Sequence, residues 1–210
     1  MVTPVATLTL ADVIAAVKRQ FGDESGVQIV DSDITRWTNQ AQREIVNKNP
    51  MIQLSASIMT GIGITHYELP DRLLQIESVF YDHCILSPVG YERISEELGP
   101  DFGQQGTPQY FYIWANVIYL WPVPDQSKQL DINYSAMPKN VTAPADLLGL
   151  PDRYFERICE YVKGLAYELD EDWTANQVQM QKFEDKLLEA NNADKNQIGS
   201  FLVAKDTEYE

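Results

Sequence analysis

The spacing of apolar residues changes twice along the chain, and this constrains the fold more than any other feature. Up to Pro50 apolar residues recur every three to four positions, from Gln53 to Ala136 they alternate, and from Pro151 the helical spacing returns. The first spacing is typical of an amphipathic helix and the second of a strand. We therefore expect an α+β protein: a four-helix bundle with an inserted β-rich domain and an extended C-terminal tail.

This reading divides the chain into four parts. They are an N-terminal helical hairpin, an inserted β-rich domain, a C-terminal helical hairpin that completes the bundle and a flexible tail, over residues 1–52, 53–137, 138–191 and 192–210. The tail is expected to be flexible because it is polar apart from a short apolar island.

Helix ends are marked by local signals. Thr9 can cap the first helix, with Asp12 three residues later as a weak capping box, and Gly22 is placed to end it. The second helix should begin near Asp31 and stop before Pro50. Both helices are therefore predicted to be amphipathic and to pack on each other.

The central segment carries turn signals between short apolar runs. Residues 54–58 and 64–69 are expected to form a pair of strands joined by a glycine-rich turn. Asp82 and His83 should turn the chain, and residues 90–98 could form a short helix. The best hairpin is Gln109–Trp121, because two aromatic, alternating runs flank Ala115 and Asn116.

Composition excludes several functions. The 210 residues include 16 Lys and Arg against 31 Asp and Glu, a net charge of −15, which disfavours wrapping of nucleic acid. Cys84 and Cys159 lack CxxC spacing and signal neither a disulfide framework nor a zinc site. The first residues have no basic signal-peptide region and no run is long enough to span a membrane, so synthesis in the cytoplasm is expected.

Residues suited to catalysis are sparse. His66 and His83 are the only imidazoles, and no hydrolase, zinc-protease or nucleotide-binding motif occurs. Asp82, His83 and Cys84 could form a site only with a distant ligand. We therefore expect no enzyme, no catalytic, cofactor-binding or metal-binding residues and no cofactor. A small hydrolase or metal-dependent enzyme without a motif is kept as an alternative.

The predicted hairpin is unusually aromatic. Six rings lie within twelve residues: Tyr110, Phe111, Tyr112, Trp114, Tyr119 and Trp121. A small sheet cannot easily bury both faces of such a hairpin, so one face is expected to meet another chain. Coverage of both faces by the domain's own strands and the 90–98 helix is a second possibility. Stacking of single-stranded nucleic acid is a third, disfavoured because basic neighbours are lacking.

Three stretches together resemble the head-to-tail adaptor proteins of tailed bacteriophages, also called connector, tail tubular or head completion proteins. The first is TRWTNQAQREIVNKNP at residues 35–50. The second joins YELPDRLLQIESVFYD at residues 67–82 to YIWANVIYLWPVPDQSKQLDINY at residues 112–134. The third is LPDRYFERICEYVKGLAYELDED at residues 150–172. The resemblance lies in the pattern of residue types and in the order of these segments along the chain. It includes no catalytic motif, because this family has none.

The resemblance implies a virion structural protein at the head–tail junction, made in the host cytoplasm. Such a protein forms a ring, commonly dodecameric, between the portal and the tail, and provides a DNA conduit and a platform for tail attachment. Its implied partners are the portal protein, the next tail or nozzle protein and other copies of itself. Genomic double-stranded DNA would pass without tight binding, and no membrane is involved. Another ring or nozzle component, or a tail completion protein, is the alternative.

The resemblance also implies two sets of contact residues. The aromatic hairpin would be the subunit or tail contact, through Tyr110, Tyr112, Trp114, Tyr119 and Trp121. The C-terminal segment would contact the portal, through Ile198, Phe201, Leu202, Val203 and Tyr209. The acidic charge agrees with a conduit, since negative walls repel phosphates over a Debye length of about 8 Å.

Overall fold

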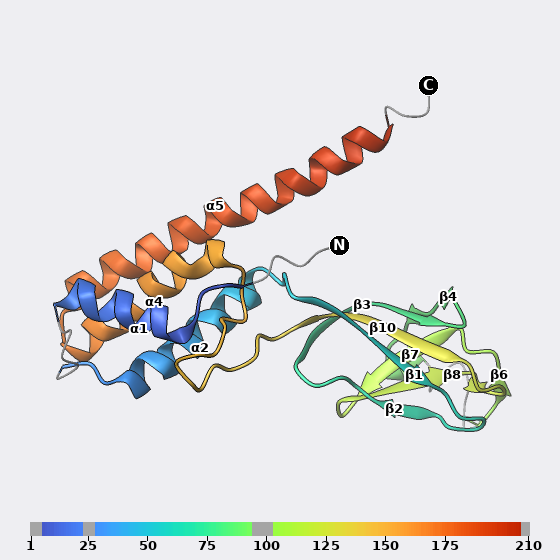
Figure 1. Cartoon of the computed structure of the whole chain (residues 1–210). Coiled ribbons are helices and arrows are strands. Elements are labelled where there is room, and N and C mark those ends of the chain that lie inside the picture. The colour runs from blue at the N-terminus through green and yellow to red at the C-terminus, as the bar shows by residue number, and fades with distance from the viewer. Residues whose placement is uncertain (1–5, 23–27, 94–102, 207–210) are drawn as a thin grey trace. The chain divides into compact units, whose positions relative to one another are not determined.

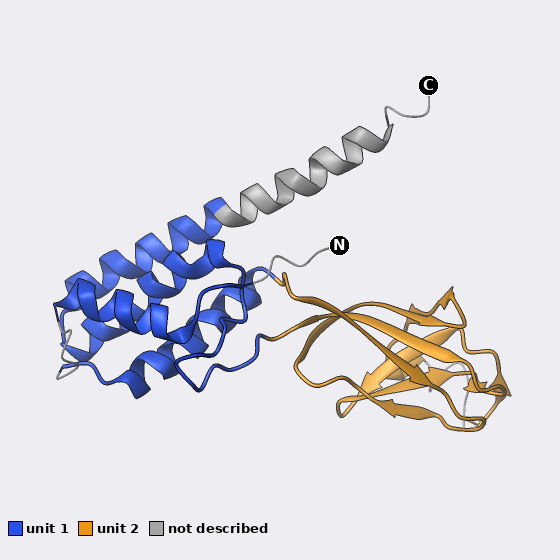
Figure 2. Cartoon of the chain, viewed as in Figure 1, with its two compact units in different colours: residues 1–49, 138–210 blue, residues 50–137 orange. Residues whose placement is uncertain are grey.

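The chain divides into two compact units. The computed structural model describes residues 6–22, 28–93 and 103–206, with side chains as far as residue 189. One unit comprises residues 1–49 and 138–210, and the other comprises residues 50–137 (Figure 2). We call them the helical unit and the β unit. The finer division into four parts stays a prediction.

The helical unit joins the two ends of the chain (Figure 1). It contains α1, α2, a short 3-10 helix η1, α4 and α5, over Leu10–Phe21, Asp31–Lys48, Asp152–Tyr154, Phe155–Leu169 and Trp173–Asp206. The predicted start of α1 is confirmed: Thr9 and Asp12 form a reciprocal capping box, and Gly22 ends the helix with a φ of 68°. The predicted limits of α2 are confirmed as well.

The expected four-helix bundle is wrong. Helix α4 packs against α1, α2 and α5, whereas α5 packs mainly against α4. At 1.5 Å per residue, the 34 residues of α5 span about 51 Å and the 15 residues of α4 only about 22 Å, so α5 cannot pair with α4 along its whole length. The expected extended tail is also wrong, because α5 continues to Asp206. The structure is a mixed α+β fold with helices and sheets.

The β unit contains ten strands in its described part. In chain order β1 to β10 are Gln53–Met59, His66–Glu68, Leu73–Tyr81, Cys84–Ile85, Ser87–Pro88, Gln105–Gly106, Tyr110–Trp114, Val117–Trp121, Val123–Pro124 and Gln129–Ala136. They form two four-stranded sheets, ordered β1-β10-β3-β4 and β2-β8-β7-β5, and a small β6-β9 sheet. The strands expected at 54–58 and 64–69 are therefore not partners: β1 pairs with β10 and β2 with β8.

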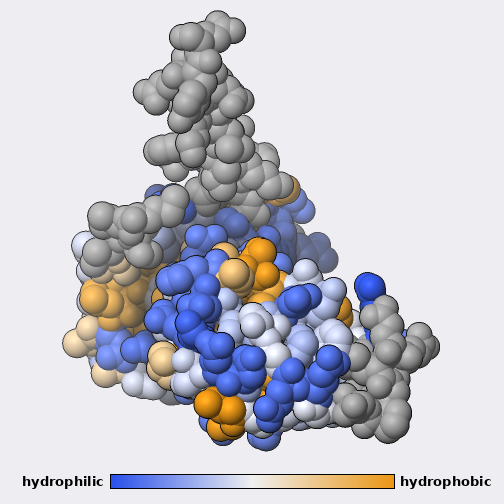
Figure 3. Space-filling model, turned by 90° about the vertical axis from the view of Figure 1, so that its right-hand side faces the viewer, coloured by the Kyte–Doolittle hydropathy of each residue, from blue (hydrophilic) through white to orange (hydrophobic). Residues whose placement is uncertain are grey.

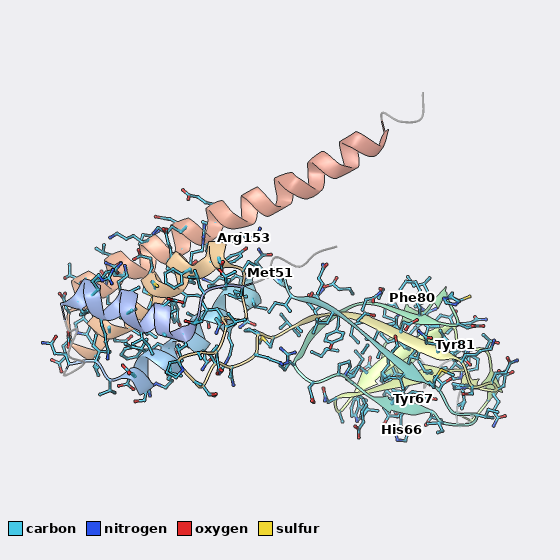
Figure 4. The ribbon with its side chains drawn as sticks, viewed as in Figure 1. Met51, His66, Tyr67, Phe80, Tyr81 and Arg153 are labelled. Atoms are coloured by element: carbon cyan, nitrogen blue, oxygen red, sulfur yellow. The ribbon has the colours of Figure 1, made fainter. Side chains whose placement is uncertain are left out.

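The core of the β unit lies between its two four-stranded sheets. Tyr67 on β2 and Tyr81 on β3 come from different sheets and are both buried in this core (Figure 4). Phe111, Ile118 and Leu120 contribute from β7 and β8, and β10 contributes alternate apolar residues. Of the helix expected at 90–98, residues 91–93 are helical, Gly90 is not, and residues 94–98 lie outside the described residues.

Candidate interaction surface

The aromatic residues predicted as a contact lie on the β7–β8 hairpin. Ala115 and Asn116 form its turn with φ values of 50° and 63°, and positive φ at both positions is typical of a type I′ hairpin. The register places Tyr110 opposite Trp121, and Tyr112 opposite Tyr119. Side chains alternate along strands, so these rings share the face opposite the core. The predicted hairpin is confirmed.

The rings form one continuous surface, which we call the aromatic face: His66, Tyr91, Tyr110, Tyr112, Trp114, Tyr119 and Trp121. The Tyr112 and Tyr119 rings stack with centroids 4.7 Å apart and an interplanar angle of 7°. The Tyr110 and Trp121 rings stack at 5.7 Å. Tyr91 lies 5.8 Å from Tyr112 and 5.4 Å from Trp114, measured between ring centroids.

The aromatic face is partly open to solvent. Trp114 is 59% exposed and Tyr91 is 46% exposed, whereas Tyr112 and Tyr119 are half-buried. A hollow of about 260 Å³ is lined by Thr65, Tyr91, Tyr112, Tyr119 and Leu120. On the side of the molecule drawn in Figure 3, hydrophobic residues form separate patches in a mostly hydrophilic surface. Exposed apolar patches are often binding surfaces, so the contact role of the aromatic face stays a prediction.

The polar atoms of this face can donate hydrogen bonds. Burial raises the pKa of Tyr112, and the neighbouring Tyr119 and Tyr91 raise it further, which favours the protonated hydroxyl. The indole N–H of Trp121 is buried and has no hydrogen-bond partner within the described residues. The hydroxyl of half-buried Tyr112 can donate to a partner, whereas the buried Trp121 N–H is covered by the protein itself.

Charge argues against a nucleic-acid partner for this face. Residues 50–137 contain three basic residues, Arg72, Arg93 and Lys128, and ten acidic ones. Stacking surfaces for single strands combine rings with cations that contact phosphates. The β unit has the aromatic rings, but it carries more carboxylates than cations. A protein surface is therefore a better partner for the aromatic face than a nucleic acid.

Two members of the aromatic face were not predicted as contact residues. Tyr91 lies outside the hairpin, and His66 was considered only as one of the two imidazoles of the chain. Pairing of β2 with β8 places His66 opposite Tyr119, with ring centroids 5.7 Å apart. Helical or strand spacing could not reveal these neighbours, because the pairing of distant segments brings them together.

The predicted portal contacts lie beyond the part of the chain whose side chains the structure describes. Ile198, Phe201, Leu202 and Val203 belong to α5, but their side chains lie beyond the described ones. Tyr209 lies outside the described residues. These assignments remain predictions.

The residues considered for catalysis have ordinary structural surroundings. The Asp82 carboxylate pairs with the Lys128 ammonium at 3.1 Å. Cys84 and Cys159 are both free thiols, and burial raises the pKa of Cys159 to about 12, so its reactive thiolate is scarce at neutral pH. In the described ranges no group of three or more His, Cys, Asp or Glu side chains could hold a metal ion.

Within the part of the chain that the structure covers, no helix combines the length and the apolar character needed to cross a membrane.

These features define a class of protein that acts by association, with an exposed aromatic face on a rigid sheet. A family model described as SU10 adaptor protein matches residues 8–203, so the chain belongs to the SU10 adaptor protein family. The resemblance to bacteriophage head-to-tail adaptors is thereby confirmed, and the chain is a structural adaptor of the virion that associates with other head and tail components. A search of curated proteins finds no match.

Proposed function

We propose that this chain is a non-enzymatic head-to-tail adaptor that forms a ring, dodecameric in its mature form, between the portal and the tail. The observation that carries the proposal is the family match over residues 8–203, which spans both units. The ring provides a platform on which the tail is attached and a conduit through which the genome leaves the head.

The charge of the chain suits the conduit. A net charge of −15 per copy gives a ring surface that repels DNA phosphates over about 8 Å at physiological ionic strength. Double-stranded DNA can then slide past without being held. The same charge makes copies repel one another, so assembly requires local contacts that outweigh this repulsion or the portal as a template.

The aromatic face and the C-terminal segment supply these contacts in our proposal. Trp114 and Tyr91 are the exposed aromatic anchors, which suits contact with a neighbouring copy or the next tail protein. Ile198, Phe201 and Leu202 are spaced i, i+3 and i+4 in the sequence, as in an amphipathic segment that contacts the portal, together with Val203 and Tyr209.

The test is reconstitution with the cognate portal protein. The purified chain, alone and mixed with portal, is imaged by negative-stain electron microscopy. We expect closed rings seated on the portal, while the chain alone need not form rings. Failure to bind the portal overturns the proposal, and binding to tail proteins alone would instead identify a tail component.

A further inference from the structure

Of the strands that end the two four-stranded sheets in the described part of the β unit, β1 is the longest. Strands β1 and β4 lie at the edges of one four-stranded sheet, and β2 and β5 at the edges of the other. β1 has seven residues, β2 has three, and β4 and β5 have two each. An edge strand presents N–H and C=O groups that another strand can bond. β1 is therefore the edge best able to accept one.

The pairing of β1 with β10 shows which groups face outward. The Ala136 N–H donates to the Ile52 carbonyl at 2.8 Å, and the Thr60 N–H donates to the Lys128 carbonyl at 2.9 Å. The register between these two points is regular, and hydrogen-bonded pairs alternate in antiparallel sheets. Even-numbered residues thus bond to β10. The outward groups belong to Gln53, Ser55, Ser57 and Met59, and no backbone bond within the described ranges reaches them from elsewhere.

The composition of β1 leaves this edge unprotected. Its sequence, QLSASIM, contains no charge and no proline, although the chain has 47 charged residues. Natural edge strands are usually protected by lysine, proline or a bulge. Leu54 is 38% exposed and Met59 is 65% exposed. The edge is a place where two copies of an acidic chain can meet without bringing charges together.

We propose that β1 pairs antiparallel with β1 of a second copy, centred on Ala56. In this register Ser55 lies opposite Ser57, Leu54 opposite Ile58, and Gln53 opposite Met59. Odd-numbered residues face odd-numbered ones, so the outward N–H and C=O groups meet as hydrogen-bonded pairs. Leu54 and Ile58 add an apolar cross-strand pair. The two sheets become one continuous sheet.

Electrostatics permits this pairing. The nearest carboxylate beside β1 is that of Asp131, which lies on β10 opposite Ser57 and is bonded to the Ser57 hydroxyl and the Gln129 amide. Three strand spacings separate the two β10 backbones in the pair by about 14 Å, and the two Asp131 positions are also offset along the strands because Ser57 lies opposite Ser55. This exceeds the Debye length of about 8 Å. Repulsion between them is largely screened.

The pairing is distinct from the ring contact of the proposed function. A two-fold contact closes after two copies, so it describes the free chain before assembly. Its failure would leave the ring proposal untouched, and failure of portal binding would leave this pairing untouched.

The first test changes one outward N–H. Ser55→Pro removes an N–H that does not bond to β10. Proline also restricts the preceding residue to an extended backbone, which Leu54 already has in β1. Sedimentation equilibrium of the full chain should show a dimer that Ser55→Pro weakens at least tenfold, with an unchanged melting temperature. The control Ser55→Ala keeps the N–H and should dimerise normally. A wild-type chain that is monomeric at every concentration overturns the proposal.

The second test fixes the register with single cysteines in a Cys84→Ser background, which removes the exposed native thiol. Ala56 meets itself in a non-hydrogen-bonded pair, where Cα atoms are about 4.5 Å apart, within the range for a disulfide. Ala56→Cys should therefore give a disulfide-linked dimer. Leu54→Cys alone should not, but a mixture of Leu54→Cys and Ile58→Cys chains should. Equal cross-linking of all single variants would contradict the register.

Discussion

The rings of Tyr112 and Tyr119 lie nearly parallel across the β7–β8 hairpin, with centroids 4.7 Å apart and an interplanar angle of 7°. An aromatic pair of this kind contributes about 0.5–1.5 kcal/mol beyond the burial of its area. Because both rings are half-buried on the face opposite the core, the pair holds the aromatic face in one conformation before a partner arrives. A pre-formed face loses less side-chain entropy on binding.

Trp114→Ala should separate binding from folding. Trp114 is 59% exposed, so its loss should change the free energy of unfolding by no more than about 0.5 kcal/mol. As an aromatic anchor it should weaken association with a neighbouring copy or the next tail protein at least tenfold, about 1.4 kcal/mol. Urea unfolding and ring formation on the portal measure the two effects.

Phe111→Ala is the matched control, because Phe111 lies on the other face of the same strand and is buried in the core. It should lower the free energy of unfolding by about 3–5 kcal/mol. Normal assembly and tail attachment by Trp114→Ala would show that the aromatic face is not a contact.

Local signals in the sequence predicted the elements whose ends are defined by near neighbours. The capping box of Thr9 and Asp12 and the alternation of the Gln109–Trp121 hairpin are of this kind. Long-range pairing was not predictable. The Asp152 carboxylate accepts hydrogen bonds from the Thr7 and Leu8 N–H groups, more than 140 residues away in the sequence.

The partners of strands and helices were the least predictable feature. A glycine-rich turn suggested that β1 and β2 pair, yet each finds its partner in a different sheet, because burial of alternate faces, not proximity in sequence, decides the pairing. Leu169 follows the helical spacing that begins at Pro151, yet it is 55% exposed, so periodicity alone does not show which residues are buried. For the candidate site, the hairpin rings were predicted, whereas Tyr91 and His66 required the fold.

Gly149→Ala should destabilise the helical unit by about 1–3 kcal/mol. A Cβ at this position would lie 2.9 Å from the Pro138 Cβ and 3.2 Å from the Gln42 Oε1. That oxygen already accepts a hydrogen bond from the Gly149 N–H at 2.6 Å, so it has little room to move. Thermal unfolding followed by circular dichroism measures the loss. Gly90→Ala, where a Cβ meets nothing within 4 Å, should be neutral within about 0.5 kcal/mol.

The helical unit should lose stability in acid. Hydrogen bonds from the side chain and backbone of Thr7 lower the pKa of Asp152, and those from the backbone of Ala143 and Thr142 lower the pKa of Asp146. The folded state then binds protons more weakly than the unfolded state, so this stabilisation is complete above about pH 4 and is lost as the pH falls through the lowered values.

Melting temperatures at pH 7 and pH 3 test this prediction. Asp152→Asn should melt lower than the wild type at pH 7, and the difference should shrink at pH 3, where the unfolded chain already binds the proton and part of the stabilisation is lost. A difference that is equally large at both pH values would contradict the role of ionised Asp152.

Glu160→Gln should cost about 3 kcal/mol of unfolding free energy. The Lys163 ammonium lies 2.8 Å from one Glu160 oxygen, and the Lys186 ammonium lies 3.2 Å from the other. Burial raises the pKa of Glu160, but these two cations outweigh burial and hold it below its usual value. Without the carboxylate the largely buried Lys163 loses its counter-charge. Urea unfolding measures the cost, and the double variant Glu160→Gln with Lys163→Met should recover most of it.

Deletion of residues 192–210 should abolish portal binding and leave the remaining fold intact. The truncation removes the proposed portal contacts Ile198, Phe201, Leu202, Val203 and Tyr209 but keeps Phe183 and Leu187, which are the buried anchors of α5 in the helical unit. Pull-down with the cognate portal, beside circular dichroism of the truncated chain, separates loss of binding from loss of fold. Trp114→Ala is the matched control, because it alters the other proposed contact and should still bind the portal. Portal binding by a folded truncation would assign the portal contact to another surface of the chain.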